Sequence, residues 1–436
     1  MELSTRPLTG MRQLYPSEMA VEAYIVSMVR KAACSYGFEE YDGPTIEPVE
    51  LFLAKSGGGL ISEQGYSFED RGGRRVVLRP EMTPSLARMI ASAPEVPSPV
   101  RWMSFPLCFR YERPQRGRVR EFRQFNLDIL GETGSMGDLE VMLVLDRIMK
   151  NLGALPGTYR IGYSGRGLAT DVLRAVGIAP EEIQSALGAV DRIGKMQRPE
   201  WLAYAAGILG SDEKASVLEK FASVRSLDDE WLAGAASGSG SYARMKEFAG
   251  LLEAAGLASA SFDASVVRGL DYYTGTVFEL SDTGSGNRRA ICGGGRYDDL
   301  VGLFGGKPVT GVGFGLGLLT LKLFLETYGL LPADPGECCR PQVFVAVYSA
   351  SEAPAALAWA ESLRAHGVRT VMEIEGRSIS RQFRAAGKAG ARLVVVAGPE
   401  EVASGEALVK DMASGTEHRV RSGSLTSWIL GMLASG

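Results

Sequence analysis

The sequence predicts a mixed α/β (α+β) protein that is divided into several domains. The chain of 436 residues is longer than one ordinary core requires, and 45% hydrophobic with 22% charged residues is a globular composition. Strand-like and helix-like patterns also alternate along it. The apolar runs at 311–319 and 392–398 are much shorter than the roughly 20 residues that cross a bilayer, and residues 1–19 lack the apolar region of a secretory signal. We therefore expect a cytoplasmic protein.

The first section, residues 1–154, is expected to combine helices with strands. Apolar residues recur at helical spacing from Pro16 to about Tyr36. A second helix is expected in SLARMIASA, directly after LRPEMTP. Strand patterns occupy 99–112 and 121–131.

Alanine-rich helical runs follow, and they predict an inserted helical domain over 155–257. Strand and glycine signals return over 258–330, so the first section resumes there. Prolines and a glycine mark a linker at 331–340. Beyond it, residues 341–436 alternate strand-like QVFVAV, VRTVMEI and RLVVVAG with helix-like runs, which predicts a separate small α/β domain.

Cysteine and histidine usage excludes several kinds of site. The five cysteines are odd in number and show no CxxC spacing, so we expect reduced thiols, no disulfide framework and no protein-bound metal. The two histidines, His366 and His418, lie near the C-terminal end. A Ser-His-Asp or Cys-His mechanism in the main body is therefore not expected.

Positive charge is concentrated in one segment although the net charge is −4. FRYERPQRGRVREFR, at 109–123, is a candidate phosphate site; an ordinary solvated loop is the alternative. Its six arginines are Arg110, Arg113, Arg116, Arg118, Arg120 and Arg123.

The strands beside this segment predict a ligand-binding face. Since alternate residues of a strand share a face, Arg110 and Glu112 point the same way. On the second strand the shared face carries Phe122, Gln124, Asn126 and Asp128. An aromatic ring among polar groups favours a floor for an aromatic, phosphorylated ligand, and a polar surface is the alternative. The chain has no GxxxxGK[ST] sequence, so ATP would not be bound by a Walker loop.

Two later segments add candidates. VVRGLDYYTGTVFEL places Arg268 before the pair Tyr272 and Tyr273. ICGGGRYDDLVGLFGGKPVTGVGFGLGLLTL, at 291–321, holds two glycine clusters. These glycines either let a ligand approach the backbone or serve tight packing.

Together these segments resemble class II aminoacyl-tRNA synthetases, specifically the histidyl-tRNA synthetase family, over nearly the whole chain. FRYERPQRGRVREFRQF resembles motif 2, and RGLDYYTGTVFE a peptide particular to histidyl enzymes. GFEEYDGPTIEP, at 37–48, resembles motif 1, which builds the dimer interface around a proline, here Pro44. LRPEMTP resembles the amino-acid-binding stretch, and the C-terminal RQFRAAGKAGARLVVVAG the anticodon-binding domain.

The resemblance implies an antiparallel-sheet catalytic domain with a helical insertion and a C-terminal anticodon-binding domain. It implies ATP-dependent activation of L-histidine and transfer to the 3′ end of histidine tRNA by a homodimer, with Mg²⁺ on the ATP phosphates. Arg110 and Arg268 would be the catalytic pair that grips the α-phosphate. Phe122 would stack on adenine, Glu112 would face its edge or the tRNA 3′ end, and Arg118 would approach the outer phosphates.

For histidine, the resemblance implies that Glu81 and Thr83 hold the α-ammonium group, with Gln124 nearby. Asp128 and Tyr273 would bind the two imidazole nitrogens, a pairing that fixes the ring's tautomer. Tyr272 and Arg268 complete the expected histidine site. The expected readers of the tRNA acceptor end are Arg113, Gln115 and Arg116.

The chain departs from the class at the end of motif 3. GVGFGLGLLTL has Thr320 where an arginine normally covers the adenine, opposite the motif 2 phenylalanine. Two alternatives to the synthetase remain at this point. One is a catalytically silent paralogue that senses histidine as the regulatory subunit of ATP phosphoribosyltransferase, and the other is a tRNA- or nucleotide-binding scaffold without an amino-acid site.

Overall fold

The computed structural model describes most of the chain in two compact units, 1–331 and 332–436. It describes residues 4–53, 59–93, 98–267, 272–284, 286–287, 289–305 and 308–435, without the side chains of residues 59, 60, 62 and 338. No helix among these residues is long and apolar enough to cross a membrane.

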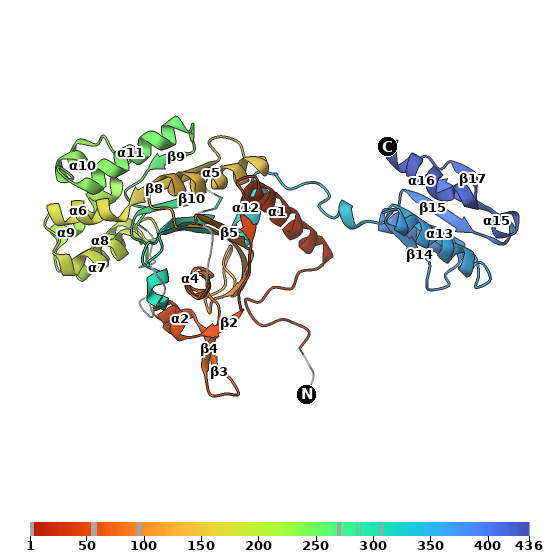
Figure 1. The fold of residues 1–436 in the computed structure, drawn as a ribbon, viewed down its shortest axis with the longest axis horizontal. Coiled ribbons are helices and arrows are strands. Elements are labelled where there is room, and N and C mark those ends of the chain that lie inside the picture. The colour runs from red at the N-terminus through yellow and green to blue at the C-terminus, as the bar shows by residue number, and fades with distance from the viewer. Residues whose placement is uncertain are drawn as a thin grey trace. The chain divides into compact units, whose positions relative to one another are not determined.

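A large, mainly antiparallel sheet forms the centre of the first unit (Figure 1). Its order in the described chain is β1-β5-β7-β12-β11-β10-β8-β9, with β6 also paired to β7. The strands are β1 (Glu39–Glu40), β5 (Val100–Ser104), β6 (Leu107–Phe109), β7 (Glu121–Leu130), β8 (Tyr159–Gly165), β9 (Ala260–Phe262), β10 (Thr276–Asp282), β11 (Cys292–Arg296) and β12 (Gly311–Gly317).

Three helices share a hydrophobic core with one face of this sheet. They are α1 (Pro16–Cys34), α5 (Met136–Asn151) and α12 (Leu318–Thr327). The predicted helix from Pro16 is therefore confirmed. On β7, Phe125, Leu127 and Ile129 are buried in that core. The alternation of side chains then turns the even-numbered residues of β7 to the other face, as predicted.

The expected strand over 99–112 is interrupted, which corrects the prediction. β5 ends at Ser104 and β6 begins at Leu107, and Pro106 lies between them. Proline has no N–H for a sheet ladder, and its carbonyl oxygen instead accepts from the Gln124 N–H at 3.0 Å. After Phe109 the chain leaves the strand, so Arg110 and Glu112 lie in a loop.

A small sheet and short helices lead into the second predicted helix. The sheet has the order β2-β4-β3. Its strands are β2 (Ile46–Pro48), β3 (Tyr66–Glu69) and β4 (Arg75–Leu78), and the helices are α2 (Glu50–Leu53), α3 (Gly59–Gln64) and α4 (Thr83–Ser92). Proline in the first turn of α4 suits a helix start, because no intrahelical N–H is lost there.

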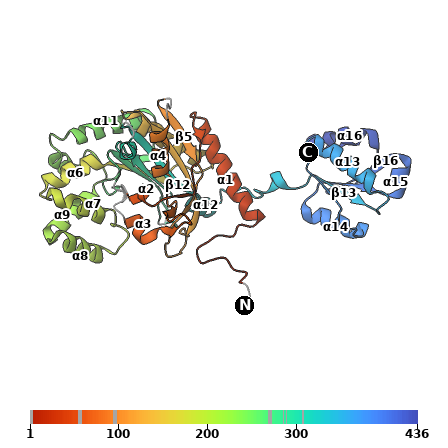
Figure 2. The same cartoon turned by 60° about the horizontal axis from the view of Figure 1, so that its bottom comes forward.

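Helices α6 to α11 gather at one side of the central sheet in both views (Figure 1, Figure 2). They are α6 (Arg166–Ala175), α7 (Ile183–Val190), α8 (Arg198–Leu209), α9 (Asp212–Ser223), α10 (Glu230–Ala235) and α11 (Gly240–Ala254). The helical stretch thus starts at Arg166 and not at residue 155, because β8 pairs along its length with β10. The helices connect β8 to its parallel neighbour β9, which needs a long crossover.

The second unit is an α/β sandwich with the strand order β14-β13-β15-β16-β17. Its strands are β13 (Val343–Val347), β14 (Thr370–Met372), β15 (Leu393–Ala397), β16 (Glu406–Asp411) and β17 (Glu417–Arg421). Its helices are α13 (Ala353–Ala365), α14 (Ile379–Ala389), α15 (Pro399–Ser404) and α16 (Leu425–Ala434). Separate hydrophobic clusters cover the sheet's two faces. The three predicted strands are present as β13, β14 and β15, and β16 and β17 add two more strands to the sheet.

Candidate active site

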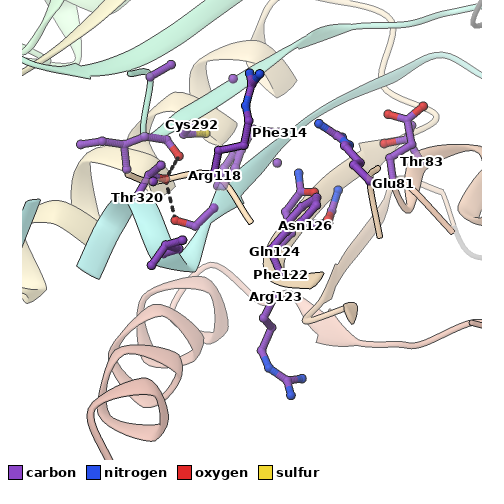
Figure 3. A pocket seen from close by; sticks show the side chains of 18 of the residues that line it. Glu81, Thr83, Arg118, Phe122, Arg123, Gln124, Asn126, Cys292, Phe314 and Thr320 are labelled. Atoms are coloured by element: carbon purple, nitrogen blue, oxygen red, sulfur yellow. Dashed lines mark hydrogen bonds between the residues drawn. The ribbon is translucent and has the colours of Figure 1, made fainter. Parts of the chain in front are cut away.

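A cleft of about 510 Å³ lies on the polar face of the central sheet. Figure 3 shows side chains of β7 between Glu81 and Thr83 on one side and Thr320 on the other. The predicted residues that line the cleft are Glu81, Thr83, Arg110, Glu112, Arg118, Phe122, Gln124, Asp128, Tyr272 and Tyr273. Segments far apart in the sequence therefore form one site.

One end of the cleft is rich in acceptor atoms without partners. Among the described residues, four buried side-chain oxygens of this cleft accept no hydrogen bond: Glu81 Oε1, Gln124 Oε1, Asn126 Oδ1 and Asp128 Oδ2. Leaving a buried acceptor unpaired costs about 1–3 kcal/mol. This end of the cleft is therefore built for a ligand that carries several N–H donors.

Asp128 lies at the centre of this end and is 1% exposed. Its Oδ1 accepts a short hydrogen bond from the Tyr297 hydroxyl. Burial raises the pKa of Asp128 to about 7, and the Tyr297 hydrogen bond opposes that rise. A carboxyl group whose pKa lies near 7 can accept a hydrogen bond from a protonated ring nitrogen or donate one to an unprotonated ring nitrogen.

Three tyrosines form the wall beside Asp128. The ring centroids of Tyr272 and Tyr273 are 4.8 Å apart, and those of Tyr272 and Tyr297 are 6.0 Å apart. All three rings belong to one buried cluster. The Tyr272 hydroxyl donates to Glu81 Oε2 at 3.3 Å, so the wall also orients the carboxylate.

Glu81 comes from the irregular segment between β4 and α4 and is 4% exposed. Burial raises its pKa, while the Arg110 cation and the Tyr272 hydroxyl lower it. A buried carboxylate with one unpaired oxygen is a complementary site for an ammonium ion. Thr83, the first residue of α4, lines the cleft next to it.

Glycines on β12 make room for the polar side chains of β7. A Cβ on Gly313 would lie 2.1 Å from Asp128 Oδ1 and 2.5 Å from the Leu127 carbonyl oxygen. A Cβ on Gly315 would lie 1.7 Å from Gln124 Nε2. Both distances are far below van der Waals contact, so the side chains of Asp128 and Gln124 occupy the space that these glycines leave open.

The other end of the cleft carries cations and an aromatic ring. The Arg110 Nε donates to the Pro80 carbonyl at 3.0 Å, and its guanidinium lies 5.3 Å from the centroid of the Phe122 ring. Arg118 pairs with Glu112 at 2.5 Å. Arginines beside a half-buried ring that lines the cleft are suited to a nucleotide, since they bind phosphate while the ring stacks on the base.

The arginine-rich loop, residues 110–120, connects β6 to β7 and has a defined tip. Gln115 and Arg118 exchange backbone hydrogen bonds of 3.0 and 2.8 Å. Gly117 has φ of +74°, as the third position of a type II turn requires. The predicted readers of the tRNA end, Arg113, Gln115 and Arg116, are exposed on this tip and do not line the cleft.

Two of the six arginines serve the fold, which corrects the prediction of one phosphate cluster. Arg120 donates to the carbonyls of Glu112 and Thr9 at 3.1 and 3.3 Å. Arg123 pairs with Glu22 of α1 at 2.8 Å. Backbone carbonyls and a carboxylate from remote segments hold these two guanidinium groups, and Arg123 also lines the cleft.

The glycine-rich segment contains a cation that points away from the cleft. Arg296 pairs with Asp138 at the start of α5 and, at 3.0 Å, with Glu132. It therefore ties β11 to the helix layer. The next residue, Tyr297, turns into the cleft.

The remaining predicted position at the phosphate end, Arg268, lies outside the described residues. Thr320 does line the cleft, at the start of α12. Its hydroxyl donates to the carbonyls of Gly317 and Ile291 at 2.9 and 3.3 Å, and Figure 3 shows both bonds. The threonine side chain is uncharged and its hydroxyl is engaged with backbone, so this position offers no cation to a nucleotide.

Several further residues line the cleft. Asn126 borders the histidine-facing end, on the face of β7 that the alternation predicted, although the sequence assigned it no role. Tyr297 also borders this end and gave no local signal in the sequence. Asp191 and Lys195, an ion pair of 2.7 Å, reach the cleft from the helical insertion. Within the described residues, no three His, Cys, Asp or Glu side chains gather as a metal site.

Comparisons with known proteins identify the family. The family model for histidyl-tRNA synthetase matches residues 10–321, and the model for an anticodon-binding domain matches 342–432. A histidine–tRNA ligase of Opitutus terrae is 38% identical over 94% of both chains. One of Leptospira biflexa serovar Patoc is 35% identical over 95% of this chain and 94% of that protein.

A solved structure agrees with these relatives. The histidyl-tRNA synthetase from Nostoc sp. PCC 7120 has a TM-score of 0.79 and 25% identity, and the match covers 99% of this chain and 100% of that one. Both family models fall on the units that the structure separates. The chain therefore belongs to the histidyl-tRNA synthetase family.

Proposed function

We propose that this chain is a histidine–tRNA ligase that forms histidyl-adenylate in the cleft on the central sheet and transfers histidine to the 3′ end of its tRNA. The observation that carries the proposal is that one cleft contains two kinds of binding group, acceptors for an amino acid and cations for a nucleotide. Buried oxygens without partners occupy one end, and arginines beside Phe122 occupy the other.

The acceptor-rich end matches L-histidine. The α-ammonium group and the neutral imidazole ring together offer four N–H donors, one for each unpaired oxygen. Glu81 and Thr83, with Gln124 nearby, bind the ammonium group. Asp128 accepts from one imidazole nitrogen, and a tyrosine hydroxyl, from Tyr273, serves the other. A site whose buried groups need these donors rejects amino acids that lack them.

The cationic end binds ATP, which enters as its magnesium complex. Phe122 stacks on adenine, Glu112 faces its edge, and Arg118 leaves its pair with Glu112 to bind the outer phosphates. Arg110 binds the α-phosphate, and Arg268 approaches it from the other side. Mg²⁺ would supply charge neutralisation on the triphosphate, and Arg110 and Arg118 would add the protein's own positive charge.

Catalysis in this arrangement depends on orientation and charge. A histidine carboxylate oxygen attacks the α-phosphorus, the bond to pyrophosphate breaks, and the arginines stabilise the negative charge that develops. The terminal ribose hydroxyl of the tRNA then attacks the carbonyl carbon, and AMP leaves. No protein nucleophile is required in either step.

The tRNA and a second copy of the chain complete the proposed assembly. Arg113, Gln115 and Arg116 on the loop tip contact the acceptor end, and residues 341–436 bind the anticodon. The segment 37–48 forms the homodimer interface, and the exposure of Pro44 supports that role. We place the enzyme in the cytoplasm.

The deciding experiment is aminoacylation of a histidine tRNA transcript with each of the twenty amino acids. Charging with histidine alone is expected. A protein that binds histidine but neither exchanges pyrophosphate at saturating ATP nor charges tRNA would instead be the histidine-sensing regulatory subunit of ATP phosphoribosyltransferase. The named histidine–tRNA ligases among the relatives favour the enzyme.

A further inference from the structure

One arginine near the nucleotide end has no role so far. Arg289 lies between β10 and β11, and the next two residues, Ala290 and Ile291, line the cleft. Its side chain is half-buried. The segment is fixed to the start of α12 because the Ile291 carbonyl accepts from the Thr320 hydroxyl at 3.3 Å. Arg289 therefore stands at the rim beside Thr320.

The tip of the arginine-rich loop packs against the same part of the rim, beside Arg289 and Thr320. The point where a Cβ would stand on Gly117 lies 3.6 Å from the Cδ of Arg289 and 3.7 Å from the Cγ2 of Thr320. Thus the loop tip lies against both the aliphatic part of the Arg289 side chain and the Thr320 methyl group. An arginine at position 320 would have to share this space with Arg289, whereas the short threonine leaves it open.

The charges at this point are not balanced. Arg289 has no hydrogen bond or ion pair within 4.0 Å among the described residues. Burial lowers its pKa, the Arg118 cation lowers it further, and Glu112 opposes both. Glu112 is already paired with Arg118. Arg118 and Arg289 are therefore two neighbouring cations with a single carboxylate nearby. A ligand with several negative charges would stabilise them both.

We propose that Arg289 binds the triphosphate of ATP together with Arg118, and so supplies from the β10–β11 connection a cation that Thr320 does not provide. The inference rests on the proposed function of the cleft and adds to it a nucleotide-binding residue. Arg289 approaches from the side of Thr320, whereas Arg110 approaches from the side of Phe122. The phosphates are thereby held between two walls of the cleft.

The test is pyrophosphate exchange with the full-length chain, comparing wild type with Arg289→Ala and Arg289→Gln. Losing one charge-assisted contact raises the KM for ATP by about tenfold, while the KM for histidine stays within about twofold. Inhibition by adenosine, which has no phosphate, should be unchanged. Adding Thr320→Arg to Arg289→Ala should recover much of the ATP affinity, because the space beside the loop is then open.

Matched controls separate this role from a general effect. Arg147→Ala removes an exposed arginine of α5 outside the cleft and should leave both KM values unchanged. Thermal unfolding of each variant reports folding, and Arg289→Gln keeps the length of the side chain. An ATP KM within twofold of wild type in Arg289→Ala and Arg289→Gln would overturn the proposal. Equal weakening of adenosine and ATP would also overturn it, because adenine would then be the partner.

Failure of the proposed function gives a different result. If wild type exchanges no pyrophosphate, calorimetric titration with Mg·ATP still compares wild type with Arg289→Gln. Weaker ATP binding by the variant would support the Arg289 site in a protein that is not a ligase. Equal binding would overturn the site itself.

Discussion

Replacing Asp128 by asparagine should change how the stability of the empty protein depends on pH. Burial raises the pKa of Asp128 from 3.8 to about 7. In the unfolded chain the carboxyl ionises near its ordinary value. Between these values only the folded state holds the proton, so the free energy of unfolding falls as pH rises from about 4 to about 7.

The magnitude follows from the pKa difference. At about 1.36 kcal/mol for each pH unit, charging the buried carboxylate costs about 4 kcal/mol across the full window and about 3 kcal/mol between pH 5 and pH 8. Asparagine imitates the protonated carboxyl. Its Oδ1 can accept from Tyr297, and its Nδ2 takes the place of an oxygen that has no partner among the described residues.

Urea unfolding of wild type and Asp128→Asn at pH 5, 6, 7 and 8, without ligands, measures the effect. The variant should gain about 3 kcal/mol relative to wild type over this series, with the gain levelling off above pH 7. Tyr297→Phe tests the geometry, since loss of the donated hydrogen bond raises the Asp128 pKa further. A constant difference between wild type and Asp128→Asn at every pH would refute the reasoning.

Three further predictions concern the cleft and the division of the chain. Gly315→Ala should raise the KM for histidine by about tenfold with little loss of stability, because the new Cβ meets the flexible end of Gln124; pyrophosphate exchange and thermal unfolding measure the two effects, and an unchanged KM would contradict the assignment of Gln124. Glu81→Gln should raise the histidine KM by roughly 10- to 100-fold at an unchanged ATP KM; an equal rise of both would show a general disruption. The chain truncated after Leu331 should still form histidyl-adenylate but charge tRNA poorly, since each unit has its own core; normal charging would remove the anticodon role from the second unit.

Local sequence patterns predicted the polar face of β7 because a strand's period of two fixes which residues point together. Phe122, Gln124 and Asp128 could be grouped without knowing any strand neighbour. Tyr297 could not, because its approach to Asp128 depends on the register in which β11 and β12 follow β7. That register is set by pairing between segments more than 150 residues apart.

The clustering of arginines along the chain does not predict which of them can bind a ligand. Whether a guanidinium is available to a ligand depends on acceptors from other segments, and these are invisible in a local window. The carbonyl of Thr9 and the carboxylate of Glu22 occupy Arg120 and Arg123. Arg289, in contrast, stands alone in the sequence and lies beside the loop only because β10 and β11 pair.

The anchoring of the arginine-rich loop determines where it can bend. At its base, the Arg110 N–H donates to the Arg120 carbonyl at 2.9 Å, and the Arg120 N–H donates to the Gly10 carbonyl at 2.8 Å. The Arg120 guanidinium also stacks 3.9 Å from the Tyr111 ring centroid. Among the described residues, the hydrogen bonds and ion pairs of the tip are those of its own turn and of the Arg118–Glu112 pair. The loop should thus act as a short flap with a rigid hinge line: substrates can displace the tip, while Arg110 stays aligned with the sheet through each catalytic cycle.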